Sequence, residues 1–197
     1  MKQFIEKLKE QGYILEDEKN AKLLYLFSKK REIVGKNIST MLLEGMSGAG
    51  KTALAEAFNG VVEGKEIFLQ CFRGIDSDNL IIEPNISAII KKDSDNAISK
   101  GALVRALIES HKHPVTLIID EIDKADAAFD CLLLDFINSG RVTDGINEWR
   151  KGNFPIWVFL TSNGERDLSD ALLNRVRKVT VERMSKKSFL NALHKCL

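Results

Sequence analysis

A glycine-rich segment at residues 45–52 carries the clearest chemical signal in this sequence. It reads Gly-Met-Ser-Gly-Ala-Gly-Lys-Thr and fits the phosphate-loop pattern G-x-x-x-x-G-K-S/T. Glycines let the backbone approach a phosphate closely, and a following helix directs unpaired N–H groups at the same anion. We expect Lys51 to hold the outer phosphates and the Thr52 hydroxyl to bind Mg²⁺. The predicted phosphate-binding residues are Gly45, Met46, Ser47, Gly48, Ala49, Gly50, Lys51, Thr52 and Ala53.

Two acids, Asp120 and Glu121, follow an apolar run at residues 115–119, which is typical of a strand buried on both faces. An Asp there can hold the Mg²⁺ already bound to Thr52, and a neighbouring Glu can orient and deprotonate water. Alternatively, the strand simply ends in acids before the next helix, because carboxylates are stabilising near a helix N-terminus. The phosphate loop upstream favours the catalytic interpretation. Asp120 is therefore predicted to bind nucleotide and Mg²⁺, and Glu121 to act as the general base.

Two further residues, Asn163 and Arg175, have the right chemistry for phosphoryl transfer. Asn163 follows an apolar run at residues 156–160 and can hold the attacking water from the other side. An asparagine after a strand is also ordinary turn chemistry. Arg175 follows a short predicted helix, and a cation at the terminal phosphate accelerates this reaction strongly. By itself, Arg175 fits a solvated arginine better than a catalytic one.

The elements that must position these residues alternate between strands and helices. Strands are predicted at residues 39–44, 66–71, 115–119 and 155–160, with an edge strand at 176–181. Helices are predicted near residues 4–11, 16–30, 53–60, 102–108, 125–139 and 168–173. This order predicts an α/β fold, a five-stranded parallel sheet with helices on both faces. Ligands of such sheets bind beyond the carboxyl ends of the strands, where the polar clusters lie.

Two segments, residues 72–100 and 141–154, do not fit the alternation and read as hairpin-like insertions or loops. The three cysteines, Cys71, Cys131 and Cys196, lack metal spacing and are predicted to be buried free thiols. The three histidines, at positions 111, 113 and 194, show no partner pattern and are predicted to lie at the surface.

The bulk composition excludes few function classes. Apolar residues make up 44% and charged residues 29%, as in a folded globular protein. The formal net charge of +1 does not indicate nucleic acid as a partner, although a local basic patch would suffice for one. No apolar run approaches the length of a membrane span, and the N-terminus has no apolar signal region. We therefore expect a cytoplasmic protein without a membrane partner.

Together, these motifs resemble AAA+ ATPases, and more narrowly their MoxR-like branch. Residues 43–52 resemble the Walker A motif, 117–126 the Walker B motif, 159–163 the sensor 1 strand, and 171–176 the segment with the arginine finger. The resemblance covers about residues 13–181 in the family's order. It implies that the sensor strand lies between the two Walker strands. It also implies a homo-oligomeric ring, usually a hexamer, in which Arg175 reaches a neighbour's site.

The resemblance carries further expectations about the rest of the chain. It implies that Tyr13 and Ile14, or Val34 and Gly35, border adenine, and that both insertions face the ring pore. Residues 1–183 would form the nucleotide-binding core. Residues 184–197 would be the first helix of a lid that is otherwise truncated or absent. Arg166 is a second candidate for the arginine that acts in trans.

The leading functional prediction is a Mg-ATP-hydrolysing AAA+ ATPase that remodels or assembles a protein partner of unknown identity. The catalytic residues would be Glu121, Asn163 and Arg175, and the cofactors ATP and Mg²⁺. One alternative is a nucleic-acid accessory ATPase such as a helicase loader, because a few basic residues in a pore loop would suffice. Another is a non-hydrolysing nucleotide switch, which Glu121 argues against. The arrangement for water also argues against a small-molecule kinase.

Overall fold

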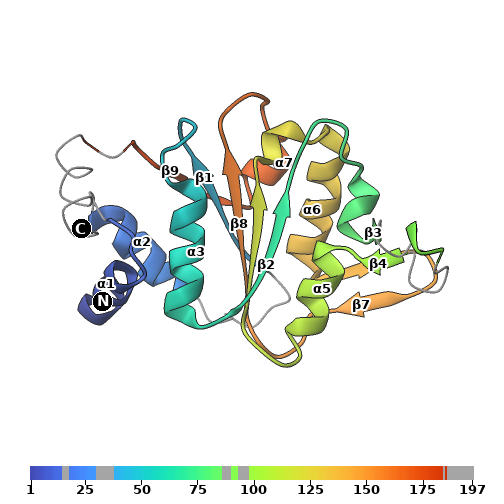
Figure 1. Cartoon of the computed structure of the whole chain (residues 1–197), viewed down its shortest axis with the longest axis horizontal. Coiled ribbons are helices and arrows are strands. Elements are labelled where there is room, and N and C mark those ends of the chain that lie inside the picture. Colours follow the sequence, from blue (N-terminus) through green and yellow to red (C-terminus); the bar gives the residue numbers. More distant parts are fainter. Residues whose placement is uncertain (15–17, 30–37, 86–89, 93–97, 184, 186–197) are drawn as a thin grey trace.

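The computed structural model describes residues 1–14, 18–29, 38–85, 90–92, 98–183 and 185, and its centre is a parallel β-sheet (Figure 1). The sheet has five strands in the order β2-β5-β8-β1-β9, and each neighbouring pair is parallel. The strands are β1 (Ser39–Glu44), β2 (Lys65–Gln70), β5 (Val115–Asp120), β8 (Ile156–Ser162) and β9 (Arg177–Thr180). The structure confirms the predicted α/β fold, including the place of β8 between β1 and β5.

Helices cover both faces of the sheet, because successive strand residues point to opposite faces and both sets are apolar. One face packs against α1 (Lys2–Glu10), α2 (Glu18–Lys29) and α3 (Lys51–Val62). The other packs against α5 (Ala102–Glu109), α6 (Ala127–Ser139) and the short α7 (Asp170–Leu173). In β1, for example, Met41 and Leu43 belong to the first core and Leu42 to the second.

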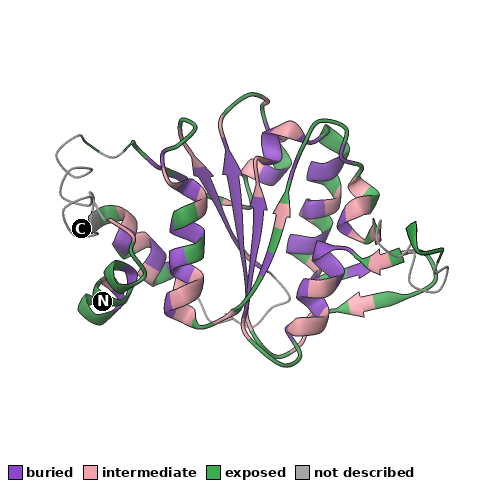
Figure 2. Cartoon of the chain, in the orientation of Figure 1, coloured by how far each residue is buried: buried purple, intermediate pink, exposed green. Residues whose placement is uncertain are grey.

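The inner strands β5 and β8 are almost fully buried, as Figure 2 shows along their length. An aromatic cluster fixes α3 on this sheet: the Phe58 ring lies 5.0 Å from that of Phe159 and 5.5 Å from that of Trp157. The edge strand β2 is more exposed and carries charged residues at its start. The buried centre of the sheet therefore leads to the predicted site: Asp120 ends β5, and Asn163 follows β8.

Both insertions contain antiparallel strand pairs, as predicted for residues 72–100 and as one of the two alternatives, loop or hairpin, for residues 141–154. After the short 3-10 helix η1 (Ser77–Leu80), β3 (Ile82–Pro84) pairs with β4 (Ile98–Lys100). The second hairpin pairs β6 (Arg141–Thr143) with β7 (Glu148–Arg150). The two hairpins lie on the same side of the molecule, beyond α5 (Figure 1).

The structure corrects three details of the sequence interpretation. Helix α3 continues through Gly60 to Val62 and does not end at Gly60. The glycine makes room for the side chain of Gln11, which a Cβ atom at position 60 would meet. Strand β8 extends to Ser162, so the polar cluster begins within the strand. Cys71 is buried as predicted, but Cys131 is exposed because it lies on the outer face of α6.

The remaining predictions concern the histidines and segments that the structure does not describe. His111 and His113 are exposed, as expected. Val34, Gly35, His194, Cys196 and, apart from Ser185, the predicted lid helix at 184–197 lie outside the described residues. Across the described part of the chain, no helix is long and apolar enough to cross a membrane.

Candidate nucleotide-binding and hydrolysis site

The phosphate loop connects the carboxyl end of β1 to the N-terminus of α3. Gly50 immediately precedes the helix with φ of 88°, a left-handed conformation that favours glycine. Gly45 is required for a different reason, since a Cβ atom there would lie 2.2 Å from the carbonyl oxygen of Val181. The segment after β9 therefore lies directly against the start of the loop, and the backbone N–H of Val181 donates to Glu44 O at 2.7 Å.

Lys51 lies inside the loop, and its side chain is held by three oxygens. Its Nζ donates to the carbonyl oxygens of Gly45 at 2.8 Å and Met46 at 3.0 Å, and to Oδ1 of Asn163 at 2.7 Å. Burial lowers the pKa of Lys51, while the nearby carboxylates, chiefly that of Asp120, act in the opposite direction. The loop lysine is thus linked directly to the predicted sensor residue.

Asp120 and Thr52 form the predicted metal-binding pair. Thr52 Oγ1 donates to Asp120 Oδ1 at 2.6 Å, and Thr161 Oγ1 donates to the same oxygen at 2.7 Å. Within the described residues, no group of three or more His, Cys, Asp and Glu side chains could hold a metal. A carboxylate beside a hydroxyl fits Mg²⁺, which is usually bound by one or two carboxylates together with waters and substrate phosphates.

Glu121, directly after β5, is held between two side-chain amides. Its Oε1 accepts from Nδ2 of Asn163 at 3.0 Å, and its Oε2 accepts from Nε2 of Gln70 at 3.0 Å. The sequence analysis did not single out Gln70. It ends β2, and the register of β2 with β5 places it beside Asp120. A polar residue at the end of a strand adjacent to the Walker B strand is the signal that would have found it.

The sensor loop after β8 is fastened to the turn that follows β5. Asp123 is buried, and its Oδ2 accepts from the backbone N–H groups of Asn163 and Glu165, both at 2.9 Å. These two bonds fix the backbone from which the Asn163 side chain extends. Asp123 therefore has a positional role that the sequence interpretation, which saw only an acidic stretch, did not assign.

Arg166 makes an internal ion pair with Asp130 of α6. Its two terminal nitrogens lie 3.1 Å and 2.8 Å from the two carboxylate oxygens, and Asp130 is fully buried. The hydrogen bonds to Asp130 raise the pKa of Arg166. Its guanidinium balances a buried charge, which argues against Arg166 as the arginine that acts in trans.

Arg175 is exposed and lies away from its own phosphate loop. Its Nε donates to Oδ1 of Asn138, near the end of α6, at 3.1 Å. Arg177, two residues later, pairs with Met41 in the sheet register. Arg175 therefore lies near the amino end of β1, whereas the loop follows its carboxyl end, about 20 Å away at ~3.3 Å per strand residue.

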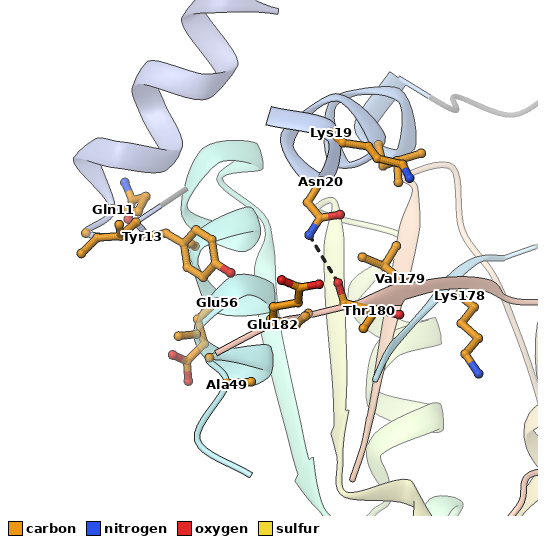
Figure 3. A pocket seen from close by; sticks show the side chains of 17 residues that line it. Gln11, Tyr13, Lys19, Asn20, Ala49, Glu56, Lys178, Val179, Thr180 and Glu182 are labelled. Carbon is orange, nitrogen blue, oxygen red and sulfur yellow. Dashed lines mark hydrogen bonds between the residues drawn. The ribbon is translucent and has the colours of Figure 1, made fainter. Parts of the chain in front are cut away.

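A pocket of about 670 Å³ adjoins the phosphate loop on the side of α1 and α2. Tyr13 and Ile14, which are predicted to border adenine, line it together with Gly50. Figure 3 shows Tyr13 and Asn20 on opposite sides of the pocket, and the Asn20 amide donates to the carbonyl oxygen of Thr180 at 3.4 Å. The volume is within the usual range for small-molecule sites.

A sequence profile of the AAA domain (dynein-related subfamily) matches residues 40–177, well over half of the chain. The chain belongs to this family. The comparison with curated proteins finds no match. All residues predicted to perform chemistry, from Gly45 to Arg175, fall within the AAA domain, whereas Tyr13 and Asn20 precede it.

Two solved structures share the fold of this AAA domain. One is a presumed ATPase from Cytophaga hutchinsonii, with a TM-score of 0.70 and 18% identity, covering 99% of this chain and 54% of that protein. The other is the Hsp104–ADP complex of S. cerevisiae, with a TM-score of 0.64 and 19% identity, covering 90% of this chain and 35% of that protein. The AAA chain therefore spans about half of the first protein and about a third of the second.

Proposed function

We propose that this AAA chain binds Mg-ATP and hydrolyses it to ADP and phosphate. One observation carries the proposal: Asn163 joins the loop lysine to the predicted general base, accepting from Lys51 Nζ and donating to Glu121 Oε1. Phosphate-binding, sensing and water-activating groups thus lie in one connected cluster. A nucleotide switch that only binds would not need Glu121 beside the phosphate loop. The similarity in fold to a structure solved with ADP is consistent with this ligand.

In the proposed reaction, Glu121 accepts a proton from water while the water oxygen forms a bond to the terminal phosphorus. The bond between that phosphorus and the bridging oxygen breaks, and its electron pair stays on ADP. Lys51 and the loop backbone hold the phosphates. Asn163 lies beside Glu121, to which its amide donates, and would help to orient the water there. The pocket beside Tyr13 receives the base.

Mg²⁺ would neutralise charge on the phosphates when bound. Thr52 and Asp120 are the residues that would hold it, since their oxygens already lie within hydrogen-bond distance of each other. Asp120 keeps a second carboxylate oxygen, because both hydrogen bonds described above go to Oδ1.

Arg175 would complete the reaction in a neighbouring copy of the chain, within a homo-oligomeric ring of the MoxR-like type. Its exposure and its distance from its own loop support this role, as does the internal pairing that occupies Arg166. A homo-oligomer in which each copy lends Arg175 to the next would place hydrolysis at the subunit interface. In this proposal, residues 1–183 form the nucleotide-binding core.

A protein, rather than a nucleic acid, is the partner that the second hairpin fits best. At its tip, Ile146 is 92% exposed. The basic residues of its strands, Arg141 and Arg150, both form ion pairs with Glu148. With Asp144 at the turn, residues 141–150 carry two basic and two acidic side chains. The hairpin therefore presents an apolar tip and no net charge, which suits contact with a protein partner more than with phosphates.

The proposed function is tested with Glu121→Gln and a matched control, Glu6→Gln, whose side chain is exposed on α1. The parent and the control should release phosphate from Mg-ATP. Glu121→Gln should bind Mg-ATP with similar affinity. It should release phosphate at least about 100-fold more slowly, because an amide cannot accept the proton. Parent-like turnover in Glu121→Gln would remove the general-base role, and failure of the parent to bind Mg-ATP would refute the proposal.

A further inference from the structure

Thr161 occupies a central position in the site, although no chemistry was predicted for it. It lies near the end of β8, where it pairs with Leu43 of β1, and its side chain is 1% exposed. Its hydroxyl lies between the two acids of the Walker B motif. It donates to Asp120 Oδ1 at 2.7 Å and accepts from the backbone N–H of Glu121 at 2.9 Å.

The directions of these two bonds are fixed. A backbone N–H can only donate, so Thr161 Oγ1 must accept from Glu121. An ionised carboxylate can only accept, so the single hydroxyl proton of Thr161 must go to Asp120. One buried hydroxyl therefore sets the rotation of the carboxylate predicted to hold Mg²⁺ and, at the same time, the backbone of the predicted general base.

The backbone of Glu121 needs such support. Its φ of 54° and ψ of 49° lie in the left-handed region, which a side-chain-bearing residue adopts only where its surroundings hold it. The bond from its N–H to Thr161 is a contact that does so. The conformation directs the Glu121 side chain toward the amides of Asn163 and Gln70.

We infer that Thr161 is a positioning residue for hydrolysis: its hydroxyl holds Asp120 for Mg²⁺ and Glu121 for water. The inference rests on the proposed ATPase function. It places the predicted metal ligand and the predicted general base under the control of one side chain of β8, the strand that leads into the predicted sensor residue Asn163. A change at Thr161 should thus affect metal use and turnover together, while leaving the phosphate loop intact.

The chain offers a matched set of variants. Thr161→Val removes the hydroxyl and nearly keeps the shape, and Thr161→Ser keeps the hydroxyl. Thr116→Val is the control, because Thr116 is a fully buried threonine on the neighbouring β5 whose hydroxyl has no hydrogen-bond partner within the described structure. Activity that is lost in Thr161→Val but not in Thr116→Val is therefore due to the hydrogen bonds of the Thr161 hydroxyl. It is not due to replacing a buried threonine of this sheet by valine.

Steady-state hydrolysis and ATP binding in EDTA are measured for all four proteins. Thr161→Val should lower kcat about 10- to 100-fold, as loss of a residue that orients a metal ligand does, and raise the Mg²⁺ concentration for half-maximal activity. Its affinity for ATP in EDTA should be unchanged. Thr161→Ser should recover most of the lost activity, and Thr116→Val should behave as the parent. Equal kcat and equal Mg²⁺ dependence in Thr161→Val and Thr116→Val would overturn the inference.

A second measurement separates this inference from the ATPase proposal. Hydrogen exchange of the Glu121 amide, followed by NMR without added nucleotide, should be at least about tenfold faster in Thr161→Val than in the other three proteins, because the amide loses its acceptor. Unchanged exchange would overturn the inference whether or not the parent hydrolyses ATP. An inactive parent with faster exchange in Thr161→Val would refute the proposed hydrolysis and keep the positional role of Thr161.

Discussion

The two ends of the central sheet hold their polar side chains in different ways. At the carboxyl end, Lys51, Asp120 and Glu121 are joined to one another through Thr52, Thr161 and Asn163. Near the amino end, the exposed side chain of Arg175 makes one hydrogen bond among the described residues, to Asn138. The residues at the carboxyl end are thus held by contacts within the chain, whereas Arg175 faces outward.

Under the proposed function, this difference would divide the steps of the reaction between copies of the chain. The carboxyl end has the residues that binding of phosphate and activation of water require, so one copy should bind nucleotide alone. The arginine that would stabilise the transition state lies on the opposite side of the same copy. Hydrolysis should therefore depend on a second copy, and binding should not.

The largest expected effect is at the carboxyl end. Lys51→Ala removes the positive side chain from the loop, and ATP binding should become unmeasurable, which corresponds to a loss of more than about 100-fold (~2.7 kcal/mol). Isothermal titration calorimetry of the parent and variant checks this. Arg175→Ala is the comparison, and its affinity for ATP should equal that of the parent. Parent-like binding by Lys51→Ala would show that the phosphates lie elsewhere.

The two arginines should differ sharply in their contribution to stability. Arg166→Ala leaves the buried carboxylate of Asp130 without its partner, which should lower the free energy of unfolding by about 3 kcal/mol. Arg175→Ala changes an exposed side chain and should cost under ~0.5 kcal/mol. Urea denaturation of both variants measures the difference. A similar cost for both would contradict the internal role of Arg166.

A smaller effect is expected at the base pocket. Tyr13→Ala should weaken ATP binding by about tenfold (~1.4 kcal/mol), because an aromatic contact with the base is lost. Tripolyphosphate, which lacks the base, should bind the parent and Tyr13→Ala equally. Equal weakening for both ligands would mean that Tyr13 supports the loop and does not contact the base.

The smallest change is expected at Cys71, which follows β2 and lies near the Walker B acids. Its reactivity reports how accessible the carboxyl end of the sheet is to solvent. Burial, aided by the charge of Asp120, raises the pKa of its thiol to about 12. Between pH 7 and pH 9 it should therefore stay protonated and resist iodoacetamide, whereas exposed Cys131 should be alkylated. Peptide mass spectrometry distinguishes the two sites, and rapid labelling of Cys71 in the folded protein would contradict the buried site.

Much of this comparison could be predicted from the sequence, because the site residues end apolar strands or begin a helix. The loop at residues 45–52, the acids Asp120 and Glu121, and Asn163 were all assigned to one edge of the sheet for that reason. The pairing of Arg166 with Asp130 could not be predicted, since it joins residues 36 positions apart on different elements.

Two other contacts were missed for related physical reasons. The role of Gln70 depends on the register of β2 with β5, which the sequence pattern does not determine to the residue. The bonds of Thr161 depend on the left-handed backbone of Glu121, a conformation that no local motif indicates for a glutamate. Cys131 was assigned to the interior from its apolar neighbours, although it lies on the outer side of α6.

The most direct test of the central claim is a mixing experiment with two variants that are inactive for different reasons. Lys51→Ala chains keep Arg175 but cannot bind ATP, and Arg175→Ala chains bind ATP but cannot assist a neighbour. The account predicts that the specific ATPase activity of the parent rises with protein concentration, that each variant alone is on the order of 10³-fold less active, and that mixing restores activity. Parent activity per chain that does not depend on concentration, together with no restoration on mixing, would contradict it.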